Sequence, residues 1–186
     1  MDDRALKEER AAAMAVSPRT VLERWATPRV ALAALAGSVA CVGGLLWRRD
    51  RLGGLELLDS RGWYTPAEAA ALFEALDRLD AGARAVYAAT ALTIDMVFPA
   101  AYGLLFAILL FRMFRAPLWV LPLALAAADA LENVTVAALA LGYAGAPSPL
   151  AWLAAAFTLV KTVLIVVTLG AVGIGATRWL WARRRR

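Results

Sequence analysis

Four ionisable side chains stand inside long apolar segments of the sequence: Asp95, Asp129, Glu132 and Lys161. A charge in the hydrocarbon region of a membrane is costly, so each of these residues needs a partner or a function. Three acids and one base leave two carboxyl groups without a counter-charge, so these groups are either protonated or face a cation, water or a polar ligand. A buried lysine, unlike an arginine, can also release its proton. These residues therefore suit the binding of a polar head group, or the movement of a proton, inside a membrane.

Counting along the apolar segments places three of these groups in one layer. At about 1.5 Å per residue, Asp95 lies roughly 13 Å below the outer surface, and Asp129, counted from the opposite end, lies at about the same level. Lys161 lies only a few Å deeper, and Glu132 and Asn133 share the helix face of Asp129. We predict that Lys161 contacts Asp129 or Asp95, with Asp129 favoured because Glu132 makes its helix face more negative. Such a contact either fixes the helix register alone or borders a functional cavity.

Two residues that follow Asp95 shape the same region. Tyr102 lies on the helix face of Asp95, and Pro99 lacks the N–H that would bond the Asp95 carbonyl, which predicts a free carbonyl and a kink. The chain has no histidine and one cysteine, Cys41, which excludes the usual zinc sites and the Ser-His-Asp and Cys-His catalytic arrangements. We expect no metal and no cofactor, and we assign no catalytic residue. The candidate ligand-binding residues are Asp95, Tyr102, Asp129, Glu132, Asn133 and Lys161.

The elements that must position these residues are membrane helices. Of the 186 residues, 62% are hydrophobic and 19% are charged, and the mean hydropathy is +0.64, which is typical of a membrane protein rather than a soluble domain. The sequence predicts an all-α, integral membrane four-helix bundle with spans at about 30–47, 85–111, 118–143 and 150–176. In this division, 1–28 is a cytoplasmic N-terminal segment, 29–176 is the membrane domain with an outer loop at 48–84, and 177–186 is a basic cytoplasmic tail.

The positions of Lys and Arg predict the orientation. The first segment and the last carry many basic residues, while the turn between the third and fourth spans carries none, so we expect both termini in the cytoplasm and the chain in the inner membrane of a bacterium. The first loop also holds six basic residues, which makes it the exception to this pattern. A cleaved signal peptide is the alternative for the first span, because Ser38 to Cys41 faintly resembles a lipoprotein cleavage site.

The outer loop contains the signature of a short helix. Thr65, Pro66 and Glu68 stand in the order of an N-cap, a first-turn proline and a capping-box glutamate. Leu72, Phe73, Leu76 and Leu79 then fall on one face. We expect this helix either at the mouth of the bundle and the headgroup region or as a solvated helix packed only on its own linker.

The element order, together with the segment Asp95-Met96-Val97-Phe98-Pro99-Ala100-Ala101-Tyr102, resembles the EXPERA superfamily of sterol isomerases and sigma-2-type receptors. The resemblance implies that buried acids, here Asp95 with Asp129 or Glu132, bind an amphiphilic ligand with a basic or polar head or move a proton on it. The chain departs from the isomerase pattern in having no histidine. Its heavy use of Ala, Leu and Arg suggests a GC-rich bacterium, in which a sterol substrate would be unusual.

Two classes of function follow from these residues. The first is a membrane protein with a buried acidic cavity that binds, or isomerises, a lipid-like or isoprenoid-like small molecule. The alternative is a non-enzymatic structural or assembly partner, in a homo-oligomer or a membrane complex, whose buried polar residues only fix helix packing. Membrane lipids are expected partners in both cases. A nucleic-acid partner is not expected, because the basic residues form no face interleaved with aromatic residues.

Overall fold

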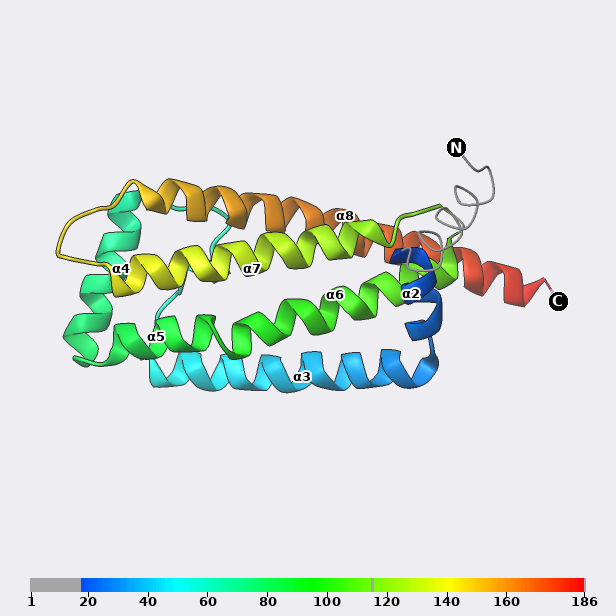
Figure 1. The fold of residues 1–186 in the computed structure, drawn as a ribbon, viewed down its shortest axis with the longest axis horizontal. Coiled ribbons are helices and arrows are strands. Elements are labelled where there is room, and N and C mark those ends of the chain that lie inside the picture. The colour runs from blue at the N-terminus through cyan, green and yellow to red at the C-terminus, as the bar shows by residue number, and fades with distance from the viewer. Residues whose placement is uncertain (1–17, 115, 186) are drawn as a thin grey trace, which may run out of the picture.

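The structure is a computed structural model that describes residues 18–114 and 116–185. Four stretches of helix in it are long and apolar enough to cross a membrane: Pro28–Arg51, Ala83–Met113, Val120–Leu141 and Leu150–Arg184. They run side by side as a bundle (Figure 1). The predicted all-α four-helix bundle is therefore confirmed.

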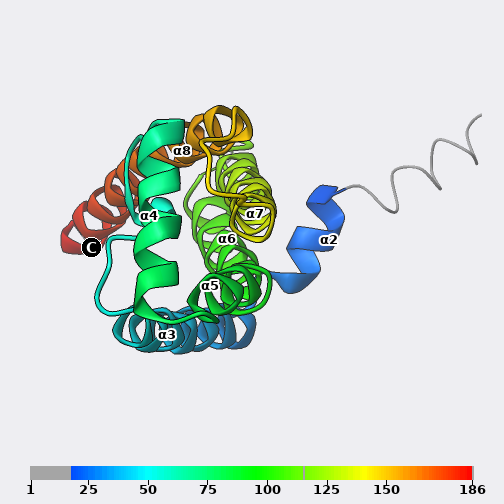
Figure 2. The ribbon, with the colours of Figure 1, turned by 90° about the vertical axis from the view of Figure 1, so that its left-hand side faces the viewer.

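The long helices pack in the order of the chain. Helix α3 (Pro28–Arg51) packs on α6 (Ile94–Met113), α6 packs on α7 (Val120–Leu141), and α7 packs on α8 (Leu150–Arg184). Helix α5 (Ala83–Ala91) extends α6 and packs mainly on α7. Helices α3 and α8 thus form the two ends of a curved row (Figure 2). We call the end of the bundle near α4 the loop end, and the end near α2 and the last turns of α8 the terminal end (Figure 1).

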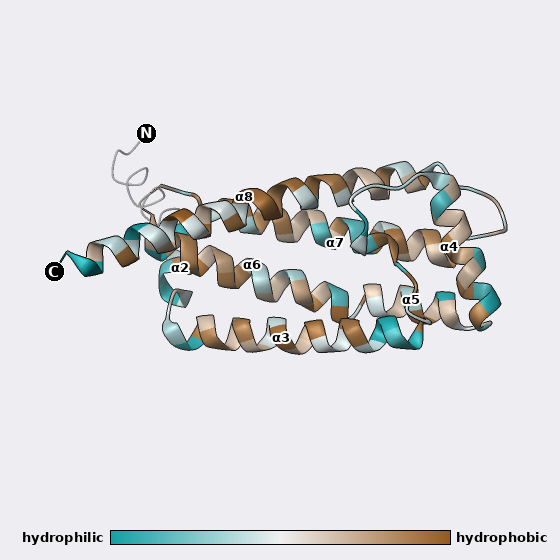
Figure 3. Ribbon diagram, turned by 180° about the vertical axis from the view of Figure 1, so that it is seen from behind, coloured by the Kyte–Doolittle hydropathy of each residue, from teal (hydrophilic) through white to brown (hydrophobic). Residues whose placement is uncertain are grey.

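The outside of the bundle is suited to lipid. Large apolar side chains such as Leu32, Val39, Val163 and Val166 are more than half exposed. Figure 3 shows apolar residues along the middle of the long helices and hydrophilic residues at α4, at the last turn of α3 and at the end of α8. This distribution is that of an apolar belt between two polar ends.

The second span is broken, but not at the predicted position. The break between α5 and α6 lies at Leu92 and Thr93, while Pro99 lies inside α6. The hydroxyls of Thr90 and Thr93 bond the carbonyls of Val86 and Ala89 one turn earlier, at 2.9 and 2.7 Å. Such bonds compete with the helix and bend it.

The fourth helix is longer than the sequence predicted. Helix α8 continues through residue 176 to Arg184, so the predicted basic tail is the last part of this helix in the described residues. At the other terminus, α2 (Pro18–Trp25) packs Leu22 against Ala107 and Ile108 of α6. The first part of the predicted N-terminal segment, 1–17, lies outside the described residues.

The loop helix is confirmed and closes the loop end of the bundle. Helix α4 (Pro66–Leu79) begins with a complete capping box: the Thr65 hydroxyl accepts from the Glu68 N–H at 3.3 Å, and the Glu68 carboxylate accepts from the Thr65 N–H at 2.7 Å. Leu72, Phe73 and Leu76 are buried in the same core as residues of α7 and α8. Helix α4 lies across the bundle mouth (Figure 2), so the alternative of a helix packed only on its linker is wrong.

The segment between α3 and α4 folds back along the bundle. Gly53 and Gly54 have φ values of 68° and 71°, a left-handed conformation that favours glycine and lets the chain reverse after α3. A short 3-10 helix, η1 (Leu58–Ser60), follows and contacts α7. Leu58 is fully buried, and its N–H donates to the Tyr87 hydroxyl at 3.2 Å. The reversal carries Asp59 to the centre of the bundle.

Candidate functional site

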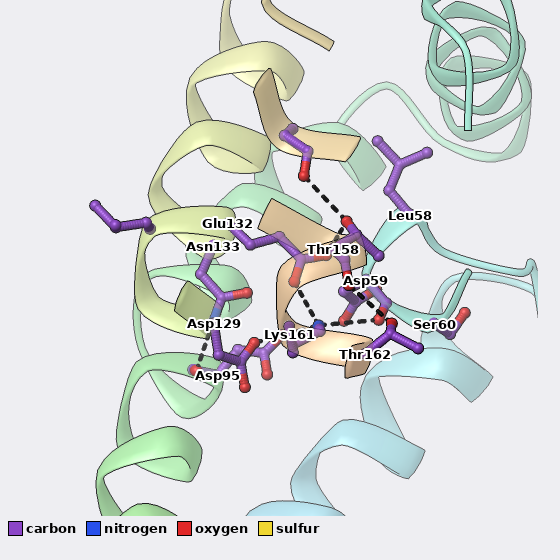
Figure 4. Close-up of polar contacts among 12 residues, drawn as sticks. Leu58, Asp59, Ser60, Asp95, Asp129, Glu132, Asn133, Thr158, Lys161 and Thr162 are labelled. Atoms are coloured by element: carbon purple, nitrogen blue, oxygen red, sulfur yellow. Dashed lines mark hydrogen bonds and ion pairs between the residues drawn. The ribbon is translucent and has the colours of Figure 1, made fainter. Parts of the chain in front are cut away.

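Charged side chains from four long helices and η1 meet in one layer, partly shown in Figure 4. Two bases and four acids make up this group, which we call the polar layer. Its members are Arg48, Asp59, Asp95, Asp129, Glu132 and Lys161. Each of the six is bonded to at least one other member, so the layer is a network rather than a set of isolated charges.

Lys161 lies at the centre of one half of the polar layer. Its Nζ is 2.5 Å from Glu132 Oε2 and 3.3 Å from Asp129 Oδ1, and it donates to the Asp59 carbonyl at 3.2 Å. The predicted contact between Lys161 and Asp129 is therefore confirmed. The closer carboxylate is that of Glu132, which the sequence analysis treated as a neighbour of the pair.

Both carboxylates beside the lysine have a second partner. The Tyr102 hydroxyl donates to Asp129 Oδ2 at 2.6 Å, and the Thr158 hydroxyl donates to Glu132 Oε1 at 2.7 Å. Glu132 is fully buried, whereas the Lys161 side chain is 16% exposed. Helices α6, α7 and α8 are joined through these bonds. Hydrogen bonds from neighbouring hydroxyls stabilise a carboxylate in a place that water does not reach.

The other half of the polar layer is built around Arg48. Its Nη1 is 2.9 Å from Asp95 Oδ2, and its Nη2 is 2.5 Å from Asp59 Oδ2. Arg48 is only 4% exposed. This guanidinium links α3 to α6 and to the segment that returns from α3. It is the second positive charge of the polar layer, beside that of Lys161.

Arg48 and Asp59 are site residues that the sequence analysis missed. Both residues fall in the predicted outer loop, 48–84. One signal was present: the buried residues of α3 include Ala34, Ser38, Cys41 and Arg48, which follow one another at helical spacing. An arginine on the packing face of a membrane helix is expected to point inward.

The carbonyl of Asp95 is free of the helix ladder, as the position of Pro99 predicted. It accepts a hydrogen bond from the Asn133 side-chain amide at 2.6 Å. The proline has no N–H to offer this carbonyl. The freed acceptor thus joins α6 to α7, and it is occupied by the protein itself.

A cleft of about 600 Å³ opens beside the polar layer, between α3, α6 and α8. Its walls are mostly apolar and include Leu35, Val39, Leu105, Phe106, Ile165 and Leu169. Leu35, Val39 and Leu169 are also among the large exposed apolar side chains. The cleft therefore opens sideways, on the apolar surface of the bundle, and we call it the lateral cleft.

Only part of the predicted site reaches this cleft. Tyr102, Asp129 and Lys161 line it. Asp95, Glu132 and Asn133 do not, and each is bonded to a residue of another helix. The six predicted residues are therefore brought together in space, but three face the cleft and three support them from behind.

Several polar atoms of the layer are buried without a hydrogen-bond partner among the described residues. Two of them are Arg48 Nε and Asp59 Oδ1. Buried polar groups are normally paired. The layer therefore retains capacity to bond a further polar group.

No group of three or more histidine, cysteine, aspartate or glutamate side chains within residues 18–114 and 116–185 is arranged to hold a metal ion. The comparisons with known proteins add no assignment: no protein-family model, curated protein or solved structure matches this chain. The geometry described above is thus the basis for assigning a function to this membrane protein.

Proposed function

We propose that the protein binds a lipid-like or isoprenoid-like small molecule in the lateral cleft, with its polar head at Lys161 and Asp129. One observation supports this proposal. The apolar cleft opens on the lipid-facing surface, and Asp129 and Lys161 of the polar layer line it. A volume of about 600 Å³ falls within the range of small-molecule sites. An apolar chain can enter such a cleft from the bilayer without passing through water.

The charges of the polar layer favour one kind of head group. Four carboxyl groups stand against two bases. An anionic head, such as a phosphate, would add a further negative charge to this excess, whereas an alcohol or an amine would donate a hydrogen bond to it. We therefore favour an isoprenoid alcohol, or an amphiphile with a similar donor head, over an isoprenoid phosphate.

A blocking substitution tests the cleft without changing any charge. Val39→Trp places a large side chain in the wall of the lateral cleft, whereas Val163→Trp places the same side chain on a lipid-facing position that does not line it. We expect Val39→Trp to abolish binding of a radiolabelled farnesol-type alcohol to the purified protein, and Val163→Trp to bind as the wild type does. Equal binding by both variants would contradict a site in the cleft.

A second function, that of a structural or assembly partner in a homo-oligomer or membrane complex, is favoured by a different observation. The side chains or carbonyls of Asp95, Glu132 and Asn133 form hydrogen bonds with residues of other helices. This is expected of polar groups whose only role is to fix helix packing. Asp129→Asn and Asp95→Asn separate the two functions. If the protein binds a ligand, Asp129→Asn folds normally and loses the ligand, while Asp95→Asn keeps it. If the role is structural, both variants lose thermal stability and the wild type retains no molecule from a lipid extract.

The resemblance to the EXPERA superfamily extends the proposal to catalysis. Isomerisation would require a proton to move at the cleft surface, and Tyr102, Asp129 and Lys161 are the groups in position for it. Incubation of the protein with an isoprenoid alcohol in deuterated water tests this step. Deuterium in a carbon position of the recovered ligand would support isomerisation, and its absence would leave binding as the activity.

The proposed location is the cytoplasmic membrane of a bacterium, with both termini inside and the segment before α4 outside. The support is the positive-inside rule, since basic residues gather at the ends of the chain. A cysteine at exposed Ala81, in the turn between α4 and α5 and in a variant without Cys41, reports the side of the membrane on which the loop end lies. We expect a membrane-impermeant maleimide to label it in intact spheroplasts. Labelling only after lysis would reverse the topology.

A further inference from the structure

A second cavity, of about 740 Å³, lies at the terminal end of the bundle, between the last turn of α6 and the last turns of α8. Its lining combines arginines with apolar and aromatic side chains, and we call it the arginine cleft. The residues that matter here are Leu109, Arg112 and Met113 of α6 and Arg178, Trp179 and Leu180 of α8. These elements meet at the terminal end of the bundle, opposite α4 (Figure 1), and on α6 the lining begins one turn beyond that of the lateral cleft, at Leu109 after Phe106.

A glycine brings the two walls of the arginine cleft together. A Cβ on Gly175 would lie 2.6 Å from the Met113 sulfur and 2.9 Å from the Phe114 ring, so no larger residue fits at this crossing without a shift. Arg112 precedes the crossing on α6, and Arg178 follows it on α8. The close approach of the helices therefore sets two guanidinium groups around one cavity.

Aromatic rings hold the cations at this cleft. The Arg178 guanidinium lies 5.9 Å from the centre of the Phe114 ring, and the guanidinium of Arg183, which lies outside the lining, is 3.9 Å from the centre of the Trp179 ring. Contacts of this kind orient a guanidinium while leaving its N–H groups free to donate. The arrangement thus presents donors to the cavity.

Among the described residues, no acid pairs with the two arginines that line the cleft. No carboxylate lines the arginine cleft, and within residues 18–114 and 116–185 neither Arg112 nor Arg178 forms an ion pair. The sequence has no acidic residue between Asp95 and Asp129 or after Glu132. The cleft therefore concentrates positive charge and is suited to bind an anionic ligand.

The depth of the cleft matches that of lipid head groups. At about 1.5 Å per residue, Arg178 lies roughly 42 Å along α8 from Leu150, past a hydrocarbon core of about 30 Å. Trp179 is an aromatic residue of the type that prefers this level. On α6, Leu109 precedes Arg112 by about one turn, so it continues the lining of the cleft towards the core.

We propose that the arginine cleft binds the phosphate head group of an anionic phospholipid, with Arg112 and Arg178 on the phosphate and an acyl chain against Leu109. Guanidinium groups bond phosphate oxygens in pairs, which gives a fixed geometry as well as attraction. The apolar walls favour a lipid over a soluble phosphate. This site is independent of the proposed isoprenoid site, which lies at another level and has an excess of acids.

The test compares lipid binding to purified wild-type protein with binding to two double variants. Phosphatidylglycerol and phosphatidylcholine with the same chains are titrated in detergent and counted by native mass spectrometry. Arg112→Gln with Arg178→Gln removes two charges from the cleft, and Arg184→Gln with Arg185→Gln removes two charges from the same end of α8, outside the lining. From the usual contribution of a basic residue near an anionic surface, we expect the first pair to weaken phosphatidylglycerol binding about 30-fold. The second pair should bind as the wild type does.

Equal losses in both double variants would overturn the proposal, because they would indicate a diffuse attraction to the whole basic end. Displacement of the lipid by millimolar inorganic phosphate would also overturn it, because the ligand would then be a soluble anion. If the first double variant fails to fold, quenching of tryptophan fluorescence by phosphatidylglycerol with brominated chains decides. Quenching that falls in Trp179→Phe but not in Trp181→Phe supports the site, and an equal fall in both variants contradicts it.

Discussion

Replacing Lys161 by methionine is the most direct test of the polar layer. The substitution keeps a long apolar side chain but removes the ammonium that lies 2.5 Å from Glu132, 3.3 Å from Asp129 and 3.2 Å from the Asp59 carbonyl. Two buried carboxyl groups then lose their nearest positive charge. Removing one partner of a buried ion pair costs about 3–5 kcal/mol. Since the Lys161 side chain is 16% exposed at the lateral cleft, we expect a loss near the lower end, about 3 kcal/mol.

The assay is the free energy of unfolding in mixed detergent micelles, measured by titration with dodecyl sulfate. Val160→Met is the matched control, because Val160 precedes Lys161 on α8 and is 46% exposed on the outside of the bundle. It introduces the same side chain without touching the polar layer. We expect the control to change the unfolding free energy by less than about 0.5 kcal/mol.

Second substitutions identify the acid that depends on the lysine. Glu132→Gln should restore more stability to Lys161→Met than Asp129→Asn does, because Glu132 is closer to the ammonium and fully buried. Asp95→Asn should restore none, since Asp95 is bonded to Arg48 instead. The reasoning fails if Lys161→Met is no less stable than Val160→Met, or if Asp95→Asn restores as much as Glu132→Gln.

Two further predictions concern helix packing and capping. Gly103→Ala should lower the unfolding free energy by about 1–3 kcal/mol, because its Cβ would lie 2.8 Å from that of Ala126, whereas Gly170→Ala, with no atom within 4 Å of the new Cβ, should not lower it. The pKa of Glu68 is lowered by the hydrogen bond from the Thr65 N–H, so its contribution to stability is present at neutral pH and is lost as the pH falls through the lowered value. The difference in melting temperature between wild type and Glu68→Ala should therefore shrink between pH 7 and about pH 3, and a constant difference would contradict this linkage.

Much of this fold could be predicted because the bilayer imposes simple rules on a sequence. A span must be long and apolar, so hydropathy alone located all four membrane helices. The Thr65 and Glu68 capping box depends only on neighbouring residues, and it formed as predicted. The contact of Lys161 with Asp129 followed from matched depth and from the cost of leaving either charge alone.

Two features could not be predicted: the rotation of each helix about its own axis, and the path of the segment between α3 and α4. A residue count gives the depth of Asp95 but not the helix that faces it, and its partner proved to be Arg48, at the edge of the first predicted span. The route of Asp59 into the bundle depends on the reversal at Gly53 and Gly54, which has no periodic signal in the sequence. The lateral cleft likewise arises from the curvature of the helix row, which side-chain spacing does not specify.

The two halves of the polar layer use different cations in a way that fits their surroundings. Arg48 lies in the half next to the returning loop, where it bonds Asp59 and Asp95 and is only 4% exposed. Arginine stays protonated in proteins, so it suits a permanent link between helix and loop. Lys161 lies in the half that borders the cleft, and lysine is the base that can exchange a proton or a partner. The Lys161 ammonium is a compact charge that contacts the Glu132 carboxylate, the Asp129 carboxylate and the Asp59 carbonyl at once, and the planar guanidinium of an arginine would not reproduce these contacts.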